Sequence, residues 1–185
     1  LASVDFSKLI YKGTRYSQHT ELSSFDTLST SDCQDFYTQF YNLNNATIFI
    51  AGKVEPTLMN QLNNLFVDIK LEPKTELFHP GTSTYLPSFH RIEKTNAIQT
   101  SFRIGKPSLG ISHPDFTKTK VLNTIFGGYF GSRLMTNIRE EKGYTYGIGS
   151  ALMSRLDASA LVIYTEVGSD VTQPALDEIR KEIKR

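Results

Sequence analysis

Cysteine is almost absent from the sequence, and other features that mark specialised proteins are missing as well. The single cysteine, Cys33, excludes an internal disulfide and any metal site built from several cysteines. No apolar run approaches the length of a transmembrane helix, and no signal peptide opens the chain. Twenty basic and nineteen acidic residues leave a formal net charge of +1, without a block of like charge. This pattern argues against a protein that tracks nucleic-acid phosphates and against a polybasic membrane patch.

The remaining composition is that of an ordinary globular protein. Hydrophobic residues make up 39% of the 185 residues and charged residues 21%, which suits one domain with a substantial core. The chain begins with Leu1, and its last helical pattern stops at Arg185. We therefore expect a fragment of a longer protein, truncated inside its last helix. Missing targeting signals then say little about location, and bacterial cytoplasm and periplasm both remain open.

The first half of the chain predicts an extended segment followed by two helices around a strand. Residues 1–28 mix short apolar pieces with polar residues and predict an extended arm or linker. Ser29 and Asp32 form a helix-start box. Apolar residues then follow at helical spacing: Cys33, Phe36, Tyr37, Phe40 and Tyr41. The nearly all-apolar residues 47–51 predict a central strand, and Pro56 is a favourable first residue for the second helix. The predicted buried stripe of that helix consists of Leu58, Met59, Leu62, Leu65, Phe66 and Ile69.

The second half predicts strands and helices in alternation. Prolines punctuate residues 70–88, which predict a long surface loop or linker. Strands are predicted at residues 89–94, 97–105, 144–153 and 157–167, and helices from about Ser112 and from Thr172 onward. This order favours an α+β fold, a two-layer sandwich with helices packed on one face of a mostly antiparallel sheet. We expect it to form a single domain over residues 29–185.

Residues 126–146 are the most distinctive stretch and predict a tight turn, a short helix and a reversal into a strand. Gly127, Gly128 and Gly131 allow the backbone to bend and to pack closely. Gly143 stands where a left-handed helix stop is expected. These four glycines are therefore predicted to have a structural role in the turns.

Arg139 falls in the last turn of that short helix and Tyr146 in the strand after the reversal, so their side chains can converge on one pocket. One alternative is structural: Arg139 pairs with Glu140 or Glu141, and the tyrosine is half buried in a sheet. The other is recognition, because a guanidinium and a phenol both donate hydrogen bonds to peptide carbonyls or to a developing oxyanion. Spacing alone favours the structural alternative.

The other candidate residues do not form a complete catalytic site. A zinc-binding helix needs two histidines one turn apart, and the histidines here are widely spaced: His19, His79, His90 and His113. His90 and Glu93 lack the second histidine of an H-x-x-E-H motif, so a surface histidine and a solvated glutamate are expected. Cys33 lies on an apolar helix stripe and predicts a buried thiol. The glycine spacing matches neither a dinucleotide nor a phosphate loop.

Two runs, GGYFGSRL at residues 127–134 and IREEKGYTY at residues 138–146, resemble a signature of the pitrilysin/insulinase family of zinc peptidases. The signature belongs to the noncatalytic, C-terminal-type domains that lack H-x-x-E-H. The segment from Phe36 to Gly52 supports the resemblance, which spans residues 20–185. Two positions depart from the family pattern: Lys53 replaces a frequent acidic residue, and Gly131 replaces a frequent serine.

The resemblance implies a processing-peptidase-like domain that encloses a chamber together with similar domains. In the family, one domain carries the zinc motif and another supplies an arginine and a tyrosine that hold the peptide substrate. These two residues map onto Arg139 and Tyr146. The chain would then be a noncatalytic substrate-binding domain that acts with a separate zinc-bearing domain or subunit. Zinc and the catalytic residues would lie on that partner, with no metal site in this chain.

Two further functions remain open. The first is a structural, core-type subunit that keeps the same fold without a proteolytic role. The second is an independent module that binds a peptide by adding it as a strand to an exposed sheet edge. The presence of both Arg139 and Tyr146 favours the peptidase function.

Overall fold

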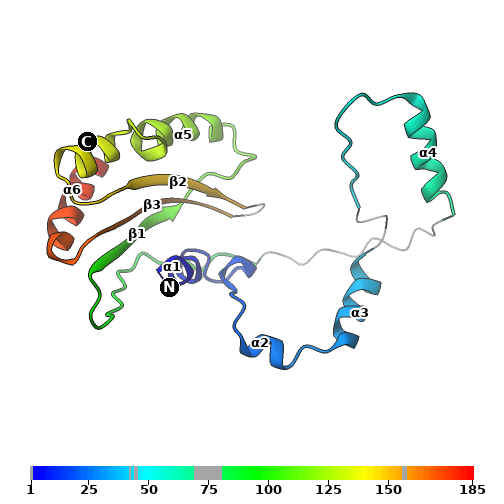
Figure 1. Cartoon of the computed structure of the whole chain (residues 1–185), viewed down its shortest axis with the longest axis horizontal. Coiled ribbons are helices and arrows are strands. Elements are labelled where there is room, and N and C mark those ends of the chain that lie inside the picture. Colours follow the sequence, from blue (N-terminus) through cyan, green and yellow to red (C-terminus); the bar gives the residue numbers. More distant parts are fainter. Residues whose placement is uncertain (1, 42, 44–45, 69–80, 156–157) are drawn as a thin grey trace. The chain divides into compact units, whose positions relative to one another are not determined.

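The computed structural model describes residues 2–41, 43, 46–68, 81–155 and 158–185, and the chain divides into two compact units (Figure 1). Unit 1 comprises Leu1–His19 and Pro80–Arg185, and unit 2 comprises Thr20–His79. Arg139 and Tyr146 both belong to unit 1. Among the described residues, none of the helices combines the length and the apolar character that crossing a membrane requires.

Unit 1 is built on a three-stranded antiparallel sheet in the order β1-β3-β2 (Figure 1). The strands are β1 (Gln99–Pro107), β2 (Ile148–Ser154) and β3 (Ser159–Gly168). β3 is central, and its Ile163 pairs with Ile104 of β1 and Ser150 of β2. Most β3 residues are buried, as expected of a strand with neighbours on both sides. The predicted antiparallel sheet is confirmed.

Helices cover one face of this sheet (Figure 1). They are α5 (Phe116–Asn123), the π-helices η3 (Thr124–Gly128) and η4 (Met135–Glu141), and α6 (Thr172–Lys184), which follows the 3-10 turn η5 (Ser169–Val171). The core between the layers consists of Leu134, Met135, Ile138, Ile148, Ile163 and Ile179. In α6, Ala175, Ile179 and Glu182 are buried at helical spacing, so one face of the helix points inward. The predicted two-layer α+β sandwich is confirmed.

The other face of the sheet carries a second, smaller cluster that includes α1 (Ala2–Ile10). Tyr11 and Ala160 are buried in this cluster, and the Tyr11 hydroxyl donates a hydrogen bond to the Met153 carbonyl at 3.2 Å. Ala160 lies three residues before Ile163 in β3, so the two side chains point to opposite faces of the sheet.

The prediction of an extended arm is therefore wrong for residues 2–10. Phe6 and Ile10 stand one helical turn apart, and both belong to the α1 cluster. The Phe6 ring lies close against Gly105 of β1, where an added Cβ would be 2.6 Å from the ring. Tertiary packing thus stabilises a helix whose apolar pieces are short when considered alone. The predicted domain limit at residues 28 and 29 stays a prediction.

Unit 2 contains α2 (Ser23–Asp26), α3 (Thr30–Phe40) and α4 (Pro56–Phe66). The helix starts agree with the sequence: Ser29 and Asp32 form a reciprocal capping box, and Pro56 is the first residue of α4. Residues 47–51 form no strand, because among the described residues of unit 2 no second strand offers a hydrogen-bonding ladder.

The predicted burial of the unit 2 helices is wrong in the described structure. Neither α3 nor α4 contains a buried residue, and Cys33 is exposed rather than buried. An apolar stripe predicts only which face of a helix will pack and not that a partner is present. Ile69 of the predicted α4 stripe lies outside the described residues.

Two predicted strands of unit 1 differ from the structure. Residues 89–94 form no strand, and the strand after the turn starts only at Ile148 rather than at Tyr144. Residues 81–88 have no regular secondary structure, as predicted for the loop. The first part of that loop, His79 and Asp157 lie outside the described residues.

Candidate functional site

One face of η4 is buried, and this places Arg139 at the surface. Leu134 and Ile138 of this segment are fully buried against the sheet, which fixes the rotation of η4 about its axis. The Gly143 N–H donates to the Arg139 carbonyl at 3.1 Å, and Gly143 has φ of +66°. This left-handed residue ends the helix and reverses the chain, as the sequence predicted. Arg139 therefore stands at the end of a helix whose inner face is anchored.

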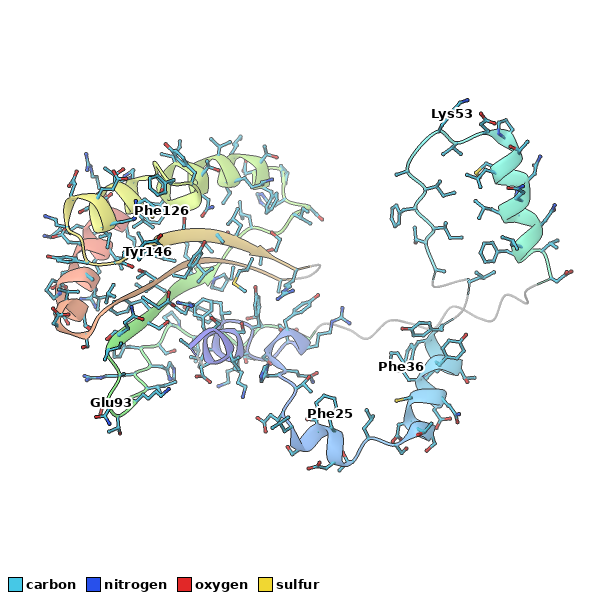
Figure 2. The ribbon with its side chains drawn as sticks, viewed as in Figure 1. Phe25, Phe36, Lys53, Glu93, Phe126 and Tyr146 are labelled. Carbon is cyan, nitrogen blue, oxygen red and sulfur yellow. The ribbon has the colours of Figure 1, made fainter. Side chains whose placement is uncertain are left out.

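Tyr146 lies just before β2 (Figure 2), and the residue is 93% exposed. Its two neighbours are fixed by hydroxyl groups. The Thr145 hydroxyl donates to the Glu166 carbonyl at 2.5 Å and accepts from the Gly147 N–H at 3.1 Å. The buried Thr165 hydroxyl donates to the Gly147 carbonyl at 2.9 Å. The backbone on both sides of Tyr146 is thereby held to β3, while the phenol projects into solvent.

The two predicted site residues do converge. The Arg139 guanidinium carbon lies 5.7 Å from the centre of the Tyr146 ring and 4.5 Å from the centre of the Phe130 ring. The nearest carboxylate oxygen is that of Glu140, 3.7 Å from Nη1, and 28% of the Arg139 side chain is exposed. Among the described residues, the Arg139 guanidinium contacts the two rings and the Glu140 carboxylate, and the distance to that carboxylate is too long for a hydrogen bond. Its N–H donors are thus available to a ligand.

Phe130 was not singled out by the sequence. It follows two glycines and a tyrosine in the turn between η3 and η4, and its contact with Arg139 joins residues nine positions apart. The sequence signal was weak: an aromatic residue in a glycine-rich stretch. In the structure Phe130 is 63% exposed.

The glycine turn packs closely onto β2 and its neighbours. A Cβ added at Gly127 would lie 2.5 Å from the Ser150 hydroxyl oxygen and 2.7 Å from the Ser150 amide nitrogen. The same serine is bound by Asn123, which donates to its carbonyl at 3.1 Å and accepts from its hydroxyl at 2.8 Å. Gly128 and Gly131 also leave little room, with added Cβ contacts of 3.1 and 2.9 Å. The turn that carries Phe130 is therefore fixed by packing.

A buried carboxylate connects η4 to α6. Glu182 is 5% exposed and accepts hydrogen bonds from Arg133 at 2.8 and 3.1 Å and from the Asn137 amide at 2.9 Å. A hydrogen bond from Lys181 lowers the pKa of the nearby Glu178, and Asn137 lowers it further. Sequence reasoning missed this network, because residues 45 and 49 positions apart give no local signal.

The model of the family described as "Peptidase M16 inactive domain" matches residues 27–185 of the chain. The chain belongs to this family. A zinc protease of Rickettsia bellii, described as uncharacterized, is 28% identical over 164 residues, covering 88% of the chain and 39% of the relative. A relative in Helicobacter pylori, named "Non-peptidase homolog YmxG", is 26% identical over 129 residues, covering 68% of the chain and 29% of the relative. The chain thus spans less than two fifths of either relative.

The fold of this M16 inactive domain is similar to that of a solved relative. The crystal structure of a peptidase M16 inactive domain from Pseudomonas fluorescens superimposes with a TM-score of 0.83 at 19% identity, covering 99% of the chain and 45% of that structure. At this identity the likeness shows the fold alone. The predicted membership of the zinc peptidase family is confirmed by the family match.

The described residues of this M16 inactive domain do not offer a set of zinc ligands. In the part of the chain that the structure describes, no three histidine, cysteine, aspartate or glutamate side chains lie together as a metal site requires. His90 and Glu93 are both exposed, and Glu93 pairs with Arg91 at 3.1 Å. Because the donor set does not fit zinc, we derive no catalytic step through a metal on these residues.

Proposed function

We propose that this M16 inactive domain holds a peptide substrate through Arg139 and Tyr146, and that a zinc-bearing domain or subunit of the same family cleaves it. The observation that carries the proposal is the convergence of the two side chains. The Arg139 guanidinium lies 5.7 Å from the Tyr146 ring, at the surface. Of the structural alternative, the pair with Glu140 is present, but at 3.7 Å it is too long for a hydrogen bond, and Tyr146 is exposed rather than half buried.

The chemistry of the two groups suits a peptide backbone. The guanidinium presents several N–H donors in one plane, and a phenol donates one O–H, so both can bind carbonyl oxygens. A donor of this kind also stabilises negative charge that develops on a carbonyl during cleavage, and removing one donor lowers turnover by about 10²-fold in comparable sites. Arg139 and Tyr146 would therefore both orient the peptide and favour its reaction.

Arg139→Ala in the complete protein, assayed with the zinc-bearing partner, tests this proposal. We expect kcat/KM for peptide cleavage to fall by about 10²-fold, because a charged donor to the substrate is lost. Arg180→Ala is the matched control, since Arg180 is an exposed arginine of α6 that pairs only loosely with Asp177 at 3.4 Å. Equal rates for wild type and Arg139→Ala would refute the assigned role.

A structural subunit is the second candidate, and the Helicobacter relative named a non-peptidase homolog favours it. Under this alternative the domain would assemble with its partner, but the complex would cleave no peptide. An H-x-x-E-H motif in the remainder of the protein or in its partner, together with peptide cleavage by the complex, would decide for the peptidase. Stable assembly without any cleavage would decide for the scaffold.

A further inference from the structure

Phe130 lies closer to the Arg139 guanidinium than Tyr146 does. The distances from the guanidinium carbon to the two ring centres are 4.5 and 5.7 Å. The two rings reach Arg139 from different segments, since Phe130 belongs to the turn between η3 and η4 and Tyr146 to the reversal before β2. Both segments are fixed, the turn through the close packing of Gly127 and the reversal through Thr145 and Thr165.

Contact with a ring restricts a guanidinium without using its hydrogen bonds. When a guanidinium stacks on the face of a ring, its N–H donors lie in its own plane and stay free for other acceptors. An arginine side chain that is free in solution loses about 2 kcal/mol of rotamer entropy when it is fixed. If a ring already restricts the side chain, less rotamer entropy is lost when the ligand binds.

Phe130 lies outside the apolar core of unit 1. It is 63% exposed and is absent from both apolar clusters of unit 1, so it stabilises neither of them. Tyr129, its neighbour in the turn, is exposed to a similar degree, at 56%, yet its ring packs beside Gly131 rather than over Arg139. Of these two adjacent aromatics, Phe130 contacts the Arg139 guanidinium and Tyr129 packs beside Gly131.

We propose that Phe130 is a positioning residue that holds the Arg139 guanidinium with its N–H edge free for a peptide acceptor. This inference rests on the proposed function, because it assigns a part in the same site. It predicts that the ring of Phe130, and not its apolar volume, is what substrate binding requires.

The test compares Phe130→Leu with Phe130→Tyr in the complete protein with its zinc-bearing partner. Leucine keeps an apolar side chain but removes the ring, so kcat/KM for peptide cleavage is expected to fall about two- to fivefold, mainly through KM. Tyrosine keeps the ring and should restore the wild-type value. Phe89→Leu, which removes an exposed ring of unit 1 away from Arg139, is the matched control and should leave cleavage unchanged. A loss with tyrosine equal to that with leucine, or none with leucine, would overturn the inference.

A second measurement separates this inference from the proposed function. Phe130→Leu should have no additional effect in an Arg139→Ala background, because the ring then has no guanidinium to hold. If Arg139→Ala impairs cleavage and Phe130→Leu does not, the positioning role fails while the proposed function stands. If Arg139→Ala is neutral, the proposed function fails.

NMR of the Arg139 side chain tests its contact with Phe130 independently of enzymatic activity. Side-chain proton resonances of Arg139 should be shifted upfield by the Phe130 ring in the wild type and in Phe130→Tyr. The shift should be smaller in Phe130→Leu, where only the more distant Tyr146 ring remains. The same spectrum in all three proteins would overturn the positioning role.

Discussion

Glu182 does not contact Arg139, but its hydrogen bonds help to fix the segment that carries Arg139. Its carboxylate is buried on α6 and binds Arg133 and Asn137, which flank the segment leading to Arg139. Buried carboxylates are costly unless their oxygens are satisfied, and both oxygens of Glu182 accept hydrogen bonds here. Glu182 therefore adds a polar contact to the apolar packing that holds η4 against α6.

Glu182→Ala should lower the free energy of unfolding by about 2–3 kcal/mol, because Arg133 would remain partly buried without its carboxylate. Urea denaturation followed by circular dichroism measures the change. Arg180→Ala, which disturbs only an exposed pair on the same helix, should change the free energy by no more than about 0.5 kcal/mol. A Glu182 variant as stable as wild type would show that the network contributes little.

Tyr11 makes stability depend on pH at the alkaline end. Burial raises the pKa of its phenol above the usual value near 10, although Arg155 acts in the opposite direction. The folded protein therefore binds the proton more tightly than the unfolded chain does. This contribution is complete below pH 10 and is lost as the pH rises above 10 through the folded pKa.

Tyr11→Phe should remove that contribution to the alkaline loss of stability. The variant also loses the hydrogen bond to the Met153 carbonyl, which costs about 1 kcal/mol at neutral pH. The midpoints of thermal unfolding of the two proteins, measured from pH 8 to 11, should therefore approach each other at high pH. Parallel curves over the whole range would exclude the proposed cause.

At the level of elements, the reversal after η4 brings the two site residues together. Gly143 has φ of +66°, and an added Cβ there would meet no atom within 4 Å. Glycine is therefore favoured at this position by the left-handed backbone conformation and not by a lack of space. Gly127 shows the opposite case, because an added Cβ would meet Ser150 at 2.5 Å.

Gly143→Ala should cost about 1 kcal/mol of unfolding free energy, since a left-handed backbone is unfavourable for a residue with a Cβ. Asparagine tolerates this conformation better, so Gly143→Asn should lie between wild type and alanine. Chemical denaturation measures the order of the three proteins. A variant with alanine that is as stable as wild type would indicate that the reversal can adopt another backbone conformation.

Local chemistry made some elements predictable from the sequence and left others out of reach. The capping box at Ser29, Pro56 of α4 and Gly143 each act within a few residues, and the structure shows all three as predicted. The strand predicted at residues 47–51 needs a partner strand, which no local pattern can supply. The same limit applies to the site. The sequence spacing predicted that Arg139 and Tyr146 can converge, whereas the contact between Phe130 and Arg139 becomes visible only in the tertiary structure.

At the level of the whole molecule, the family match over residues 27–185 accounts for most of the chain but not for a complete protease. The chain covers 39% of the Rickettsia relative, and its described residues hold no set of zinc ligands. The function proposed for Arg139 and Tyr146 requires a peptide and a partner. The Arg139 experiment therefore has to be done in the complete protein.

The π-helical form of η4 has a consequence for comparing relatives. A π-helical turn is closed by i→i+5 rather than i→i+4 hydrogen bonds, so it holds about one residue more than an α-helical turn. A relative with one residue fewer inside Met135–Glu141 would close the same turn as an α-helix and keep its arginine in the same place, although its sequence position is offset by one. An alignment that shifts a gap by a single column in this segment would assign the arginine to the wrong position.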